Sequence, residues 1–115
     1  MHELGIARSI VDIAVETARR GSARRVTCVG LRVGALAGVE EDALDLAFEV
    51  ARRGTPAESA DLRVETVALR CHCASCDVDF DVDDRHGIAL CPVCRKPSGD
   101  IRAGMELEVS YVEVM

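Results

Sequence analysis

Residues 71–94 read CHCASCDVDFDVDDRHGIALCPVC, and this stretch decides what fold the chain can adopt. It contains two C-x-x-C pairs, Cys73/Cys76 and Cys91/Cys94, with 14 residues between them. Two intervening residues let a tight turn aim both thiolates at one ion, and a second such turn completes a tetrahedral site of four sulfurs. Four protein ligands leave no coordination position open, so the spacing predicts a structural zinc ion rather than a catalytic one.

The segment around these cysteines, residues 71–99, has few large apolar side chains and cannot build a hydrophobic core alone. Metal binding would therefore supply much of its folding free energy. Disulfides are the competing interpretation, but the chain opens with Met-His-Glu and not with a secretory signal, and thiols stay reduced in the cytosol. We therefore expect a cytoplasmic protein. Four thiolates alone do not exclude an iron–sulfur cluster.

An extra cysteine, Cys71, opens a second register for the site. Cys71 with Cys76 has four intervening residues, a permitted but less frequent spacing. The two-residue spacing of the second pair favours Cys73 as the matching ligand. His72 could replace one thiolate, but its simpler interpretation is an exposed residue in the turn that leads to the first pair.

Three further features of the chain are interpreted without a function. Cys28 lies mid-strand and is predicted to be a small buried apolar side chain. His86 is predicted to be a solvated loop residue. An acidic run lacks the pattern of a calcium-binding loop and is predicted to be a solvated face; it comprises Asp77, Asp79, Asp81, Asp83 and Asp84.

Outside the cysteine segment, the sequence predicts two amphipathic helices, over residues 4–20 and about 40–53. In both, apolar residues recur at helical spacing. Gly21 stands where a left-handed C-cap would end the first helix, and Gly54 is predicted to end the second. The second helix starts with acidic residues and finishes with arginines, which suits the helix dipole.

Three strands are predicted, over residues 24–33, 61–69 and 105–111. In the last, Met105, Leu107, Val109 and Tyr111 alternate with polar residues, which is typical of a half-buried strand. The helical connection should make the first two strands parallel, and the strands near Leu69 and Met105 should pair antiparallel as the insert leaves and returns.

These elements predict an α/β (α+β) fold: a small three-stranded mixed sheet with two helices, plus an inserted zinc-ribbon-like module that holds its metal with four cysteines. Residues 1–70 and 100–115 would form the α/β domain, and residues 71–99 the structural zinc-binding module.

Composition excludes several classes of function. The chain has 115 residues and a net charge of −6, so its surface would on average repel nucleic acid. Only three aromatic residues are present, too few for stacking bases; they are Phe48, Phe80 and Tyr111. No apolar run approaches the length of about 18 residues that a membrane-spanning helix needs, so we expect no membrane partner.

The N-terminus, Met1-His2-Glu3, is a candidate nickel site. The Met1 amine, the backbone nitrogen of His2 and the His2 imidazole can form fused chelate rings, and a carboxylate such as Glu3 can contribute a further donor. Square-planar N/O coordination is what Ni(II) or Cu(II) favours. From these residues alone, a solvated terminal histidine remains the simpler interpretation.

Met-His-Glu-Leu opening an amphipathic helix, together with the Cys73/Cys76 and Cys91/Cys94 pairs in about 115 acidic residues, resembles the HypA/HybF family of hydrogenase nickel-incorporation proteins. The likeness runs over essentially the whole chain. It implies that His2 is a Ni(II) ligand, that Met1 and Glu3 assist it, and that the two cysteine pairs hold zinc. Some members also carry a first cysteine, like Cys71, that is not a ligand.

The resemblance further implies a metallochaperone that delivers nickel as cargo to the large subunit of nickel–iron hydrogenase during maturation. Its expected partners are the GTPase HypB, the hydrogenase large subunit and, in some organisms, urease maturation proteins. The chain would act as a monomer or homodimer. Zn²⁺ would be its structural cofactor, and Ni²⁺ would be transferred after protonation of the nitrogen donors.

Two rival interpretations remain. One is a zinc-ribbon interaction module in transcription or translation with no nickel role, which nickel titration of the native-terminus protein would separate from a metallochaperone. The other is an enzyme. The sequence holds no supported Ser-His-Asp or Cys-His constellation, and its predicted metal site is saturated, so we expect no catalysis.

Overall fold

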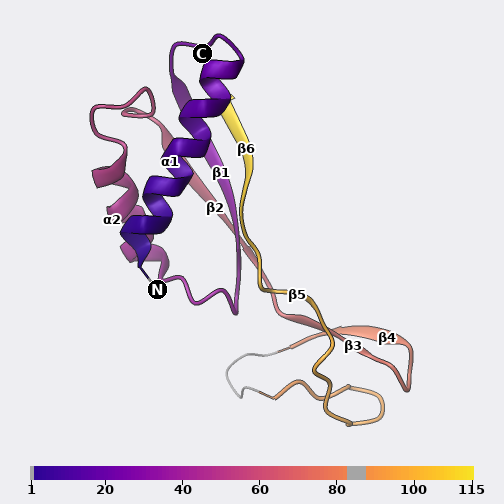
Figure 1. The fold of residues 1–115 in the computed structure, drawn as a ribbon. Helices are drawn as coiled ribbons and strands as arrows, with labels where there is room; N and C mark the ends of the chain where they lie inside the picture. The colour runs from indigo at the N-terminus through magenta and orange to yellow at the C-terminus, as the bar shows by residue number, and fades with distance from the viewer. Residues whose placement is uncertain (1, 83–87) are drawn as a thin grey trace. The chain divides into compact units, whose positions relative to one another are not determined.

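The computed structural model describes residues 2–82 and 88–115. Two helices and six strands are found in this part of the chain, in the order shown in Figure 1. They are α1 (Glu3–Arg20), β1 (Val26–Gly34), α2 (Glu41–Ala51), β2 (Asp61–Val67), β3 (Arg70–Cys73), β4 (Val78–Asp81), β5 (Ile101–Ala103) and β6 (Leu107–Val114). Among the described residues, no helix has the length and apolar character needed to span a bilayer.

The first sheet has three strands in the order β2-β1-β6. The amide of Val26 donates to Pro56 O near the start of β1, and that of Ala35 donates to Val67 O just past its end, so β1 and β2 run parallel. At the other edge Gly34 N donates to Glu106 O, and Met115 N to Arg25 O, so β6 runs antiparallel to β1. The predicted mixed three-stranded sheet is confirmed.

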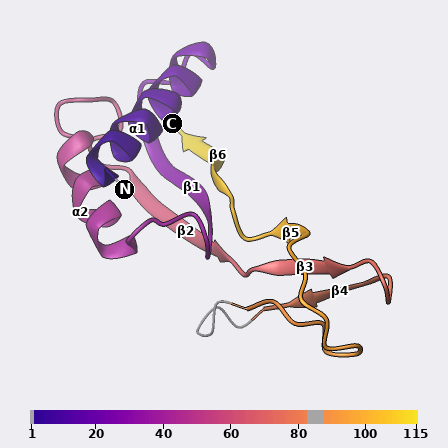
Figure 2. The ribbon, with the colours of Figure 1, turned by 60° about the horizontal axis from the view of Figure 1, so that its bottom comes forward.

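Both helices lie on one side of this sheet and pack against each other (Figures 1 and 2). Helix α1 turns a stripe of small and branched residues inward: Ala7, Ile10, Val11, Ala14 and Ala18. Helix α2 buries Leu44, Ala47 and Phe48, and β1 buries Val29 and Leu31. The Glu40 side chain caps α2 by accepting hydrogen bonds from Asp42 N and Ala43 N at 3.2 and 2.6 Å.

The second sheet is antiparallel, with the order β4-β3-β5. Cys71 in β3 lies opposite Phe80 in β4 on one side and Ile101 in β5 on the other. The insert therefore leaves along β3 and returns along β5, and these two strands pair antiparallel. The predicted strands 61–69 and 105–111 do not pair with each other, because β2 and β6 lie on opposite sides of β1. A small core fills this unit, and it includes Leu69, Cys71, Cys73, Phe80 and Cys91.

The chain divides into two compact units. The first comprises residues 1–32, 38–65 and 108–115, and the second residues 33–37 and 66–107. All four cysteines of the C-x-x-C pairs belong to the second unit, whereas His2 and Glu3 belong to the first.

Two local predictions are wrong. Gly21 is not left-handed: its φ is −86°, and the positive φ falls one residue later, at Ser22 (56°). The alternation in the last strand does not bury its apolar members, since Met105 is 62% exposed and Tyr111 42% exposed. Met105 precedes β6, and the Tyr111 ring lies against Gly30 of β1 while part of it stays open to solvent.

Gly34 is a position where the fold admits no side chain. A Cβ there would lie 2.1 Å from the carbonyl carbon and oxygen of Gly104, a backbone that cannot move aside like a flexible side chain. We expect Gly34→Ala to lower the free energy of unfolding by about 3 kcal/mol, at the upper end for overpacking. Chemical unfolding followed by circular dichroism measures it.

Gly5→Ala is the matched control, because the space around Gly5 on α1 is open and alanine favours helix by up to about 1 kcal/mol. Equal stability of Gly34→Ala and the unchanged protein would contradict the close approach.

Candidate metal centres

The structure brings the four cysteines of the two pairs together. Their sulfur atoms all lie within 4.8 Å of one another, and the Cys73 and Cys94 sulfurs are 3.6 Å apart. A tetrahedral zinc with Zn–S bonds of about 2.3 Å requires sulfurs about 3.8 Å apart. The spacing therefore fits a four-sulfur zinc site, with two ligands buried and two half-buried.

Each C-x-x-C pair lies in a turn, and the residue after its second cysteine has a positive φ. Cys73 ends β3, and the chain turns through Cys76 before β4 begins. In the second turn Arg95 N donates to Cys91 O, and Cys91 N donates to Lys96 O, both at 2.9 Å. The residue after each second cysteine is left-handed, with φ 53° at Asp77 and 64° at Arg95. Both turns thus leave their second cysteine through a left-handed residue, and both direct their sulfur atoms into one cluster.

Two of the clustered thiols have pKa values shifted in opposite directions. Backbone N–H groups of Cys94 and Val93 lower the pKa of Cys91 to about 7. The neighbouring cysteines, Cys94 first, hold the pKa of Cys76 up at about 12 through hydrogen bonds that favour its protonated form. Zinc binds cysteine as the thiolate, and a bound cation would offset the repulsion between four neighbouring thiolates.

Cys71 lies outside the cluster. It is 1% exposed and packs in the apolar core of the second unit. Burial raises its thiol pKa, with the charge of Asp100 as a smaller cause. A side chain held neutral among apolar neighbours is a packing residue, and the four clustered sulfurs are those of the Cys73 register.

The prediction that His72 is an exposed turn residue is wrong. It lies within β3, and its side chain is only 17% exposed. Its Nδ1 is 2.6 Å from Asp79 Oδ1 and its Nε2 is 3.4 Å from Asp77 Oδ1, so both ring nitrogens have carboxylate partners. The imidazole is thus engaged with carboxylates next to the cage and is not one of the clustered ligands.

Sequence reasoning missed this second layer of contacts. The Ser98 hydroxyl donates to His72 O, and His72 N donates to Asp100 O, which ties the returning strand to the residue before Cys73. Asp79 faces His72 because β3 and β4 pair in a register that sets these two residues opposite each other. Only the pairing register of the β3–β4 hairpin identifies Asp79 as the partner of His72. The sequence shows several aspartates at alternate positions there and does not indicate which of them faces His72.

Two aspartates of the acidic run, Asp79 and Asp81, pair with basic side chains. Asp79 has a lowered pKa, chiefly through its hydrogen bond with His72. Asp81 accepts a hydrogen bond from Arg70 at 3.0 Å. Cys28 is buried, as predicted, at 2% exposure. The remaining two residues of the run, Asp83 and Asp84, and also His86, lie outside the described residues.

Of the N-terminal candidates, His2 is exposed at the start of α1. His2 is the N-cap of the helix, its carbonyl accepts from Ile6 N at 3.2 Å, and its side chain makes no capping hydrogen bond. Glu3 follows in the first turn and is half-buried. Met1 lies outside the described residues. The imidazole is therefore not committed to capping the helix whose first turn it adjoins.

An open groove of about 440 Å³ adjoins these residues within the first unit. His2 and Glu3 line it from α1, and Leu46 and Val50 line it from α2. The lining therefore combines apolar side chains, among them Leu46 at 64% exposure, with an imidazole and a carboxylate. A metal held here would be open to exchange, unlike one inside four sulfurs.

The chain is similar to known proteins over nearly its whole length. The family described as "Hydrogenase/urease nickel incorporation, metallochaperone, hypA" matches residues 1–114. The hydrogenase maturation factor HypA of Chloroflexus aurantiacus is 41% identical over 113 residues, 98% of each chain. That of a Picosynechococcus species is 40% identical over 115 residues, 100% of each chain.

Solved structures share the fold. A HypA protein in solution superposes with a TM-score of 0.75 at 21% identity, covering 100% of this chain and 97% of the other. The Ni metallochaperone HypA from Helicobacter pylori superposes with a TM-score of 0.69 at 19% identity, covering 100% and 98%.

Proposed function

We propose that this chain, which belongs to the HypA family of nickel metallochaperones, binds Ni(II) at its N-terminus and delivers it to the large subunit of nickel–iron hydrogenase during maturation. The observation that carries the proposal is the placement of His2. Its imidazole is exposed, free of the helix cap and beside a carboxylate on an open groove. A cargo site needs this accessibility.

The nickel donors would come from three consecutive residues. Met1 supplies the amine, His2 its backbone nitrogen and imidazole, and Glu3 an auxiliary carboxylate. Nitrogen and oxygen donors in adjacent chelate rings suit the square-planar preference of Ni(II). The nitrogens must lose protons to bind metal, so local protonation would favour release to the acceptor.

The zinc site has a different task. Cys73, Cys76, Cys91 and Cys94 would hold a resident Zn²⁺, and their sulfur spacing fits a closed tetrahedral cage. Such a cage stabilises the second unit and leaves no position for a transferred ion. Residues 71–99 would be the part that depends on zinc for folding, and residues 1–70 with 100–115 the part that handles nickel.

Several aspects of the cellular role follow from the family. The GTPase HypB and the hydrogenase large subunit would be partners, and urease maturation proteins would be further clients in some organisms. The chain would act in the cytoplasm, as a monomer or homodimer, and without catalysis of its own. A transcriptional or translational zinc-ribbon role is not favoured, because the family match extends over the nickel-handling part as well.

Hydrogenase activity in cells that lack the native gene tests the proposal. We expect His2→Ala to restore at most about a tenth of the activity that the unchanged chain restores at limiting nickel, with recovery when nickel is added in excess. Cys28→Ala, a buried change away from both metal sites, should restore nearly full activity. Full activity of His2→Ala at limiting nickel would overturn the proposal.

A further inference from the structure

The turn that joins α1 to β1 carries a concentrated positive charge. Residues 19–25 read RRGSARR, so four of the chain's 14 basic residues fall within seven positions of a protein whose net charge is −6. All four arginines are exposed. The end of β6 lies against the same turn, where Arg24 N and Arg25 N both hydrogen-bond to Met115 O.

Only part of this charge is neutralised. Arg19 and Arg20 share a single carboxylate, that of Glu16, at 2.5 and 3.0 Å. These hydrogen bonds lower the Glu16 pKa to about 2, so its charge is constant at neutral pH, yet it offsets only one of the two guanidinium groups.

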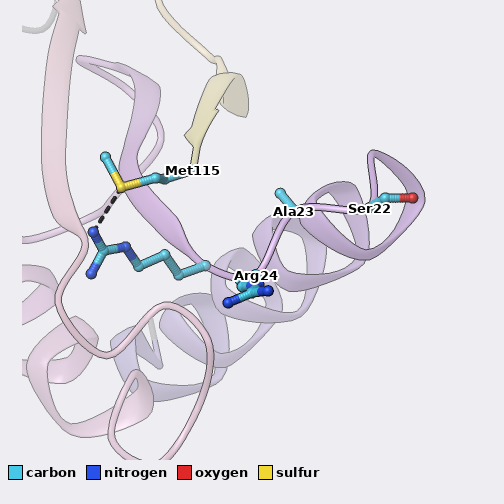
Figure 3. A pocket seen from close by; sticks show the side chains of 5 residues that line it. Ser22, Ala23, Arg24 and Met115 are labelled. Atoms are coloured by element: carbon cyan, nitrogen blue, oxygen red, sulfur yellow. Dashed lines mark hydrogen bonds between the residues drawn. The ribbon is translucent and has the colours of Figure 1, made fainter.

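The other two arginines have no side-chain carboxylate partner among residues 2–82 and 88–115. Arg25 Nη2 instead donates to the Met115 sulfur at 2.7 Å, shown dashed in Figure 3. A thioether is a weak acceptor and carries no charge. Arg24 enters no ion pair within the described chain. Both guanidinium groups therefore keep donors available for an anion.

These groups border a hollow with room for a ligand. Its volume is about 520 Å³, and Ser22, Ala23, Arg24, Arg25 and Met115 line it (Figure 3). The bonds from Arg24 N and Arg25 N to Met115 O hold the backbone from which these two side chains project. Planar guanidinium groups recognise carboxylates bidentately.

We propose that this hollow docks a short acidic segment of a partner protein, whose Asp or Glu carboxylates pair with Arg24 and Arg25. A nucleobase is not the fitting ligand, because none of the described residues that line the hollow is aromatic and able to stack on it. A long polyanion is disfavoured by the net charge of −6, whereas a short segment meets only the local positive field. This assignment does not depend on where nickel binds.

The test uses the full zinc-loaded chain and a fluorescein-labelled hexaglutamate peptide, with binding followed by anisotropy at low and moderate salt. We expect Arg24→Glu/Arg25→Glu to weaken binding at least tenfold, and Arg24→Lys/Arg25→Lys to stay within a few-fold of the unchanged chain. Arg8→Glu/Arg53→Glu, which changes the net charge equally at two other exposed arginines, should weaken binding less than threefold. Circular dichroism checks that each variant is folded.

Three results would overturn the proposal. One is the lack of peptide binding by the unchanged chain at low salt. Another is an equal loss in the Arg8/Arg53 control, which would mean that only net charge matters. The third is displacement of the peptide by inorganic pyrophosphate at a much lower concentration than free hexaglutamate, which would make the surface a phosphate site.

Discussion

Replacing His2 with alanine should abolish stoichiometric nickel binding while leaving zinc content at one ion per chain. The imidazole is the only side-chain nitrogen donor in the terminal segment Met1-His2-Glu3, and removing it breaks the chelate ring that fixes Ni(II). The fold should survive, because His2 is exposed and its backbone carbonyl, which the substitution keeps, makes the bond to Ile6 N. Elemental analysis after nickel loading measures both metals in one sample.

A non-chelating N-terminal extension is the sharper companion experiment. It converts the Met1 amine to an amide but keeps His2, so it should also weaken nickel binding at least tenfold if the amine is a ligand. Glu3→Gln should have a smaller effect, since its carboxylate is auxiliary. Unchanged nickel binding in both His2→Ala and the extended chain would show that the terminus is not the nickel site.

The pH dependence of nickel binding gives an independent check of the nitrogen ligands. Protons compete with nickel for nitrogen donors, so binding should be lost as the pH falls below about 6. Retention of nickel at a pH of about 5 would point to ligands other than nitrogen.

Alanine at any one of the four clustered cysteines should have the second large effect, loss of bound zinc and unfolding of the second unit. The small core of this unit itself includes Cys73 and Cys91, so the metal and the packing cannot be separated there. A site of three ligands forfeits much of the binding free energy that serves as folding free energy. Zinc stoichiometry and amide hydrogen exchange across residues 66–107 measure the two consequences.

Cys71→Ala is the control within the same unit. Its thiol is buried but lies outside the cluster, so zinc content should stay at one per chain, with a modest loss of stability from the lost packing. Loss of zinc in Cys71→Ala, with retention in Cys73→Ala, would mean that the ligand register begins one cysteine earlier.

The sequence by itself determined those features that depend on residues close together along the chain. The two C-x-x-C pairs, the helical periodicity of residues 4–20 and the order of the elements each depend on neighbours along the chain, and all appear in the structure. The family resemblance rested on the same local motifs and is shown by the match to residues 1–114. A tight turn or a helical stripe is encoded within a few residues, because the forces that form it act over that distance.

Other features were decided only when distant segments met. His72 is enclosed by carboxylates because the β3–β4 register sets Asp79 opposite it, and no local pattern states that register. Tyr111 alternates like a core residue yet stays 42% exposed against Gly30 of β1, because the alternation does not state whether other elements cover that face. Arg24 and Arg25 border a hollow only because the last strand returns to their turn. Exposure and partner choice depend on contacts between residues far apart in sequence, and the tertiary fold alone determines them.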